Sequence, residues 1–303
     1  MLIYNQISSN KRKTALLITV FLVFIIGLGY FFNIALNNPG ILVFAVVFSV
    51  ITALLSFFYS DKLTLAISQA KPVSRQTNTE LYRTAENLAI AAGLPTPRLY
   101  VIDDRAMNAF ATGRDPDHAV ICVTSGLLAN MNKQQLEGVI AHEMSHVGNY
   151  DIRLSTIIVV LVGIITLLAD WFLRFTFFGG ARSNDNEGGQ LQIILLIIGI
   201  ALAILSPIIA AIIQLAISRK REYLADASGA LLTRYPEGLA SALEKIQANQ
   251  IPLREANKAT AHLYIANPLK DRSGKSRGIF GGLFDTHPPT EDRIRRLRSM
   301  DLG

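Results

Sequence analysis

Four long apolar runs, separated by polar segments, set the pattern of the whole chain. They cover residues 14–32, 41–59, 154–169 and 191–217. A membrane-spanning helix needs about 20 predominantly apolar residues. The pattern therefore predicts about four transmembrane helices in two hairpins, although a re-entrant second hairpin would fit the same runs.

Basic residues flank the first hairpin at both of its ends. Lysine and arginine occupy residues 11–13, and Lys62, Lys71 and Arg75 follow the second run, whereas residues 33–40 between the runs carry no charge. Loops on the cytoplasmic side of a membrane are enriched in Lys and Arg. We therefore predict a multi-pass protein of the cell membrane whose two termini both lie in the cytoplasm.

The segment between the two hairpins has the pattern of a small α+β unit. An amphipathic helix is predicted over residues 77–92, with Leu81, Ala85, Leu88 and Ala91 on its buried face. Apolar alternation between turn residues predicts three short strands, and another helix follows them. The strands cover residues 98–102, 108–113 and 118–124.

The chain therefore divides into two hairpins and two polar segments. Further helices are predicted over residues 236–250 and 290–300 of the last segment. The predicted fold is an α-helical polytopic membrane protein with an α+β cytoplasmic domain built from both polar segments. The four divisions are a hairpin at 1–62, a polar segment at 63–153, a hairpin at 154–218 and a polar segment at 219–303.

The composition supports membrane spans. The 303 residues are 50% hydrophobic and 17% charged, with a mean hydropathy of +0.34, which is more apolar than an ordinary soluble domain. The net charge of +6 comes from basic residues beside apolar runs, so it indicates a lipid bilayer and not nucleic acid as partner. Cys122 is the only cysteine, which excludes a disulfide framework and a cysteine-rich zinc site.

The candidate chemistry lies in a helix predicted over residues 132–148. His142 and His146 stand four residues apart, so they share one helical face, with Cβ atoms roughly 5–6 Å apart, and can bind one zinc ion. Asn132, with Gln135 three residues later, predicts a capping box at the start of this helix. The alternative interpretation of the motif is a surface helix with two unrelated histidines.

A catalytic zinc ion needs three protein ligands, a position for water and a base. Glu143 directly follows the first histidine, where it can take a proton from that water. Glu222 is the best candidate for the third ligand. Asp226 lies four residues later on the same helical face and could accept a hydrogen bond from a ligand histidine. A charge cluster beside the membrane is an equally good interpretation of residues 219–226.

Membrane topology agrees with this ligand set. Two apolar runs separate His146 from Glu222, so both segments return to the same side of the membrane. His146 precedes the third run by about 12 Å of helix, which would put the metal close to the cytoplasmic bilayer surface. His118 and His262 lack metal-ligand spacing, and we predict that both are structural.

The predicted strand over residues 108–113 is a candidate substrate-binding element. A sheet edge can pair with an extended peptide and hold its backbone for attack. A plain structural strand is an equally good interpretation. The nominated residues are Asn108, Ala109, Phe110, Ala111 and Thr112.

Several blocks of the sequence resemble the HtpX family of membrane zinc endopeptidases, relatives of the type I CAAX prenyl proteases. The blocks lie at residues 108–113, 142–146, 218–226 and 286–294, and the resemblance covers nearly the whole chain. It implies a zincin-like domain of the gluzincin type. His142, His146 and Glu222 would bind one zinc ion per chain, and Glu143 would be the catalytic base.

The resemblance also suggests further roles. His287 and Arg293 would stabilise the oxyanion or bind the substrate. The substrates would be polypeptides, above all misfolded or damaged membrane proteins, cleaved at the cytoplasmic face as part of quality control under stress. The four apolar runs argue against the CAAX branch of the relatives, which has more spans.

The sequence thus predicts a membrane zinc metalloendopeptidase. One alternative is a non-catalytic membrane chaperone or scaffold with a structural zinc site, although such a site would normally have a fourth protein ligand. A second alternative is a prenyl-protein protease. The oligomeric state and the cleavage preference are not predicted.

Overall fold

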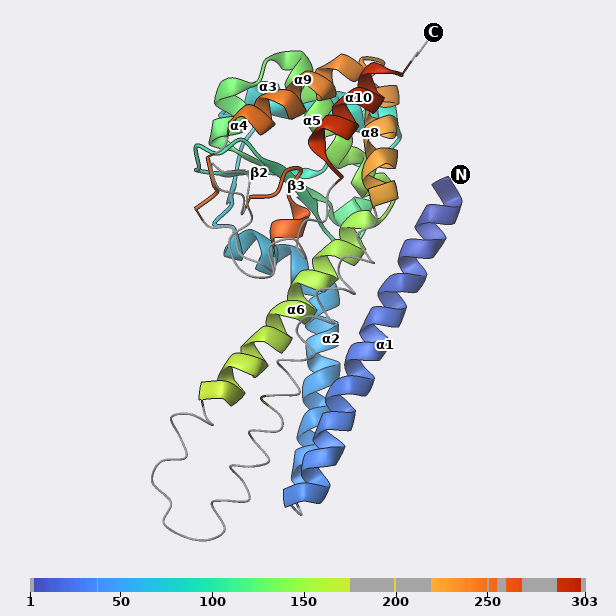
Figure 1. Ribbon diagram of the computed structural model, residues 1–303, viewed down its shortest axis with the longest axis vertical. Coiled ribbons are helices and arrows are strands. Elements are labelled where there is room, and N and C mark those ends of the chain that lie inside the picture. Colours follow the sequence, from blue (N-terminus) through green and yellow to red (C-terminus); the bar gives the residue numbers. More distant parts are fainter. Residues whose placement is uncertain are drawn as a thin grey trace.

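The computed structural model shows a compact domain from which long helices extend (Figure 1). It describes residues 3–36, 38–174, 199, 219–249, 251–254, 260–268 and 288–300. The predicted fourth apolar run, apart from residue 199, and His287 lie outside the described residues.

Among the described residues, four strands form a mixed sheet in the order β1-β2-β4-β3. The central strands β2 and β4 are parallel, and both outer strands are antiparallel to their neighbours. Within the part of the chain that the structure describes, β3 pairs with β4 alone, so it forms an edge of the sheet. The strands are β1 (Lys71–Pro72), β2 (Arg98–Ile102), β3 (Ala109–Thr112) and β4 (Val120–Thr124).

Helices cover one face of this sheet. The central one is α5 (Lys133–Gly148), which carries the two motif histidines and packs against α3, α8 and α9. Apolar side chains of the sheet, such as Ile121 and Val123, join these helices in one buried core. The other helices of this layer are α3 (Thr79–Ala92), α8 (Arg219–Thr233), α9 (Pro236–Ala248) and α10 (Thr290–Arg298).

The opposite face of the sheet packs on two of the long helices. Phe110 and Cys122 point to this side and meet Leu65 near the end of α2 (Pro39–Ile67) and Val159 of α6 (Asp151–Arg174). Tyr264 completes this second core, with its ring 5.0 Å from that of Phe110. The sheet therefore lies between a helical layer and the ends of two long helices.

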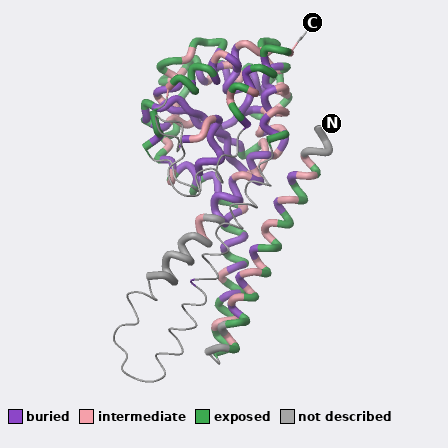
Figure 2. The backbone as a smooth tube through the Cα atoms, viewed as in Figure 1, coloured by how far each residue is buried: buried purple, intermediate pink, exposed green. Residues whose placement is uncertain are grey.

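The first hairpin consists of α1 (Ile3–Leu36) and α2, which lie side by side (Figure 1). Within the described residues, the segments Ile7–Phe31 and Pro39–Ile67 are long and apolar enough to cross a membrane. Many of their large apolar side chains are exposed (Figure 2). Exposure of this kind along a whole hairpin fits contact with lipid.

Most predicted elements of the polar segments have the expected type, with ends shifted by a few residues. Gly93 ends α3 in the left-handed conformation, at φ 65°. Ala91 was expected on the buried face of this helix but is exposed, and Ala89 is buried instead. Residues 3–13, which precede the first apolar run, belong to α1, and Asn10 among them is bonded to the domain as described below.

Candidate metal centre

Local sequence fixes the helix that carries the motif. Asn132 accepts a hydrogen bond from the Gln135 backbone N–H at 2.9 Å, and the Gln135 side chain accepts one from the Asn132 N–H at 3.1 Å. The predicted capping box is thus confirmed. It marks the start of α5, in which the four-residue spacing puts His142 and His146 on one face.

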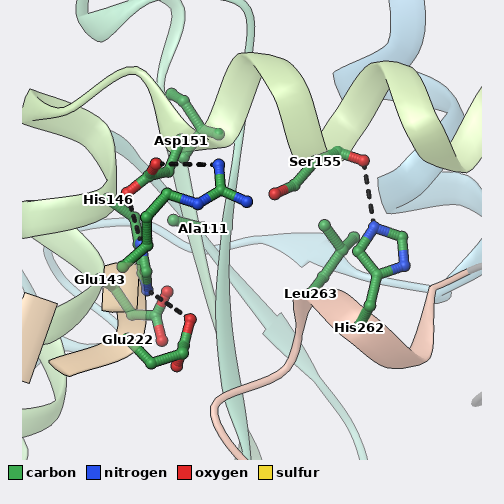
Figure 3. A pocket seen from close by; sticks show the side chains of 10 residues that line it. Ala111, Glu143, His146, Asp151, Ser155, Glu222, His262 and Leu263 are labelled. Carbon is green, nitrogen blue, oxygen red and sulfur yellow. Dashed lines mark hydrogen bonds and ion pairs between the residues drawn. The ribbon is translucent and has the colours of Figure 1, made fainter. Parts of the chain in front are cut away.

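Three side chains from two helices converge at this face. The Nε2 atoms of His142 and His146 are 3.2 Å apart, and the Glu222 carboxylate oxygens lie 3.8 Å from His142 Nε2 and 3.5 Å from His146 Nε2. Tetrahedral zinc with bonds of about 2.0–2.1 Å separates its ligand atoms by about 3.3 Å. The group therefore fits a zinc-sized cation, and Figure 3 shows His146 and Glu222 facing each other.

A glycine allows α8 to come this close to α5. A Cβ atom on Gly229 would lie 3.0 Å from the His142 backbone nitrogen. Asp226 and Glu222, about one and two turns before Gly229 on α8, are brought to the metal face by this approach. Helices normally stay 8–10 Å apart according to the side chains between them, so a small residue at this crossing decides the position of both carboxylates.

A carboxylate stands behind each histidine. Asp226 Oδ1 lies 3.0 Å from His142 Nδ1, and Asp151 Oδ2 lies 3.1 Å from His146 Nδ1. Each acceptor favours a proton on Nδ1 and leaves the Nε2 lone pair for the metal. Sequence reasoning nominated Asp226 but missed Asp151. The sequence feature that could have indicated Asp151 is its position as the first acidic residue after the motif, at the start of the next helix.

Arg293 is a buried partner of this outer layer. It donates to both Asp226 oxygens, at 2.9 and 2.7 Å, and to the Ile265 carbonyl at 3.0 Å. Its Nη1 lies 4.0 Å from a Glu222 oxygen. The predicted contact of Arg293 and His287 with substrate stays a prediction, and His287 is outside the described residues.

These contacts change the protonation of the buried groups. Burial lowers the pKa of His142 to about 4, which favours the neutral ring that a metal requires. Burial alone would raise the pKa of Asp226, but the Arg293 charge and the bond to His142 outweigh it, and the pKa is about 2. Asp226 is therefore ionised and able to orient His142.

His146 differs from His142 because carboxylates surround it. Burial would lower its pKa, but the hydrogen bond to Asp151 and the charges of Glu222 and Asp151 raise it to about 9. The anionic surroundings thus favour positive charge between the ligands. A metal cation would supply that charge and displace the proton.

Glu143 is the residue poised for acid–base chemistry. It is 1% exposed, and its Oε1 has no hydrogen-bond partner among the described residues. Burial, opposed by the nearby His146 charge, raises its pKa to about 7. A general base works best with a pKa near the operating pH, so this carboxylate can both take and return a proton.

A cavity lies beside the three candidate ligands, and the edge strand β3 borders it. Ala111 lines it together with Glu143, His146 and Glu222 (Figure 3). Ala109 accepts a hydrogen bond from the Ile265 N–H at 2.9 Å. Of the other nominated strand residues, Phe110 and Thr112 are completely buried, and Asn108 lies just before β3, bonded through its side chain to Ala266.

The cavity also contains a histidine that sequence reasoning treated as structural only. His262 lines it opposite His146, and a ring nitrogen lies 3.2 Å from the Ser155 carbonyl of α6 (Figure 3). His262 has no sequence spacing to the motif, so only the fold could place it there. Leu263, the next residue, also lines the cavity.

The comparison with known families identifies the chain. The model of peptidase family M48 matches residues 75–301. The chain belongs to peptidase family M48. It is therefore a metalloprotease, and the family resemblance predicted from the sequence blocks is confirmed.

Relatives over the full length agree with this family. The chain is 46% identical over 299 residues to a protease HtpX homolog of Tropheryma whipplei, covering 99% of each chain. It is 46% identical over 303 residues to another of Caldanaerobacter subterraneus, covering 99% of this chain and 98% of the relative. With the apolar helices, these relatives make the protein a membrane metalloprotease.

A solved structure has a similar fold. The crystal structure of S. mikatae Ste24p matches with a TM-score of 0.50 at 20% identity. The match covers 94% of this chain and 65% of the Ste24p chain. This likeness concerns the fold alone.

Proposed function

We propose that this M48 peptidase is a zinc endopeptidase that hydrolyses peptide bonds of membrane proteins at the cytoplasmic face. The observation that carries the proposal is the meeting of His142, His146 and Glu222 within 4.8 Å, beside Glu143 and next to a sheet edge. The fold brings together three candidate ligands, a candidate base and a place for a peptide.

The ligand set is of the gluzincin type. His142 and His146 would each use Nε2, and Glu222 a carboxylate oxygen, to hold one zinc ion per chain. When bound, the zinc ion polarises a carbonyl group and lowers the pKa of a water molecule to about 7. The described residues offer three ligand atoms to this site, which leaves a position for water and substrate, as in catalytic sites.

Glu143 would carry the proton. Its unpartnered oxygen and its pKa of about 7 suit a base that takes a proton from the attacking water. The same carboxyl group would then give the proton to the leaving amine as the peptide bond breaks. Arg293 and Asp226 would keep His142 oriented during this cycle.

The outer edge of β3 would hold the substrate backbone. The Thr124 N–H donates to the Asn108 carbonyl. In the antiparallel pattern, the backbone N–H and C=O groups of Phe110 and Thr112 therefore point towards β4, and those of Ala109 and Ala111 point away from it. Because Ile265 occupies the Ala109 carbonyl and the Ala111 backbone N–H is hydrogen-bonded to Glu143, the Ala111 carbonyl is the group we propose for pairing with an extended peptide. A substrate strand would therefore pair at Ala111.

The location of the site supports membrane-protein substrates. α6 begins at Asp151, five residues after His146, and continues as a long apolar helix, so the site lies near the base of the membrane helices. We propose four transmembrane helices, cytoplasmic termini and a role in quality control of misfolded or damaged membrane proteins. A substrate segment emerging from the bilayer would reach β3 without leaving the membrane surface.

The decisive experiment compares the wild type with Glu143→Gln, both purified in detergent. Zinc is measured by elemental analysis and proteolysis with casein and with a membrane-protein fragment. We expect one zinc ion per chain in both and cleavage by the wild type only, because Gln cannot accept the proton. Equal cleavage by both would refute the role of Glu143, and no zinc in either would refute the site.

A prenylated peptide, tested beside casein in the same assay, separates the alternatives. Cleavage of the prenylated peptide alone would mark a prenyl-protein protease. Zinc without cleavage of any substrate would favour a scaffold.

A further inference from the structure

A polar residue of the first membrane helix is buried beside the metal centre. Asn10 lies on α1, within the candidate span Ile7–Phe31, and is 1% exposed. Burying an amide costs free energy unless its donors and acceptor are satisfied. The partners of Asn10 therefore show what the residue holds in place.

The Asn10 side chain uses all its hydrogen-bonding groups on the catalytic domain. Its Nδ2 donates to the Asn149 carbonyl at 2.9 Å and to Asp151 Oδ1 at 2.7 Å. Its Oδ1 accepts from Arg221 Nη1 at 3.2 Å. An asparagine side chain has two N–H donors and one carbonyl acceptor, so this one residue links α1 to the α5–α6 junction and to α8.

Asp151 connects this cluster to the metal site. Its Oδ1 receives the bond from Asn10 and another from Arg221 at 3.3 Å. Its other oxygen, Oδ2, faces His146 Nδ1 at 3.1 Å. Asn10 and Arg221 therefore fix the rotation of the same carboxylate that orients His146.

We propose that Asn10 is a positioning residue for the metal centre. By holding Asp151, it sets the tautomer and ring orientation of His146, so the centre is complete only when the first membrane helix is docked on the domain. The inference rests on the proposed role of His146 as a metal ligand. Mutation of a residue that orients a metal ligand typically lowers metal affinity by 10–100-fold. Asn10 contacts such a residue, Asp151, and is therefore one hydrogen bond further from the metal.

The test measures zinc affinity, by competition with a chromophoric chelator, for the full-length protein in detergent. The main variant is Asn10→Leu, which keeps the side-chain volume and removes the amide. Asn10→Asp is the second variant, because it keeps an acceptor for Arg221 but loses both donors. Thr14→Val is the matched control, since Thr14 is buried one turn further along α1 and the change is also isosteric.

We expect Asn10→Leu and Asn10→Asp to weaken zinc binding about tenfold and Thr14→Val to leave it unchanged. In the background Asp151→Ala, Asn10→Leu should have no further effect, because residues in one network are not additive. A purely structural contact of α1 would instead lower affinity equally in both backgrounds. Thermal melting of the metal-free forms reports any loss of folding separately.

Two results would overturn the inference. Unchanged zinc affinity in both Asn10 variants would show that α1 does not act on the centre, and an effect that persists without Asp151 would show a different route. Failure of the proposed function looks different. In that case His142→Ala would keep full zinc affinity, whatever the Asn10 variants do.

Discussion

At the scale of the residue, the site is a set of buried ionisable groups that satisfy one another. His142, Glu222, Asp226 and Arg293 are all at most 4% exposed, and a buried charge is tolerated only when it is paired and hydrogen-bonded. The Arg293–Asp226 pair meets this condition within the protein. The His142–His146–Glu222 group meets it best with a metal cation between its ligand atoms, because two facing imidazole nitrogens otherwise need a shared proton.

Removing Glu222 should abolish this balance. We expect Glu222→Ala to weaken zinc binding by more than the roughly 100-fold that loss of an outer partner can cause, because a direct ligand is lost. Zinc content after dialysis against a weak chelator is the measurement. Glu137→Ala is the control, since Glu137 lies on α5 outside the ligand group. Full zinc occupancy in Glu222→Ala would refute the ligand set.

At the scale of the element, close helix crossings decide the distances at the site. α5 is approached by α8 at Gly229 and by α9 at Gly138, where an added Cβ would lie 2.5 Å from the Leu239 nitrogen. Both crossings depend on the absence of a side chain. The ligands on α5 and α8 therefore meet because two glycines let three helices pack more closely than larger residues allow.

A larger residue at the first crossing should separate the ligands. Gly229→Val would push α8 away from His142, with an overpacking cost of about 1–3 kcal/mol, and should lower both thermal stability and zinc affinity. Leu231→Val is the control, because it introduces the same β-branched residue at an exposed position of α8. If Gly229→Val binds zinc like the wild type, the crossing does not control the site.

At the scale of the whole molecule, the domain is built onto its membrane helices. Leu65 of α2 and Val159 of α6 belong to the same core as the sheet residues Phe110 and Cys122. Asn10 of α1 is bonded to the start of α6. The long helices are thus part of the packing of the catalytic domain, whereas α1 and α2 keep many large apolar side chains exposed.

The proposed topology can be tested with single cysteines. Cys122, the only natural cysteine, is completely buried, and burial raises the pKa of its thiol, so it should not react. In intact cells, a membrane-impermeant maleimide should label Pro39→Cys, at the first residue of α2, but label Lys133→Cys only after lysis. Labelling of Lys133→Cys in intact cells would reverse the proposed orientation.

Local features were predictable because they depend on neighbouring residues. The capping box, β2 at residues 98–102 and the shared face of His142 and His146 follow from patterns within one turn or strand. Glu222 could be nominated because zinc chemistry requires a third ligand and the topology restricts where it lies. The ends of the elements were predicted less well than their types, since α1 begins at Ile3 and the apolar run only at residue 14.

The sequence by itself determined the apolar hairpin, the motif helix and the family of this protein, since each depends on residues that are neighbours in an apolar run, a helical repeat or a motif block. Only the tertiary structure decided which distant groups complete the centre. Asn10 lies 141 residues from Asp151 and 211 from Arg221, and His262 lies 107 from Ser155. No periodicity or spacing encodes such pairs, because they exist only once the helices and the sheet have packed.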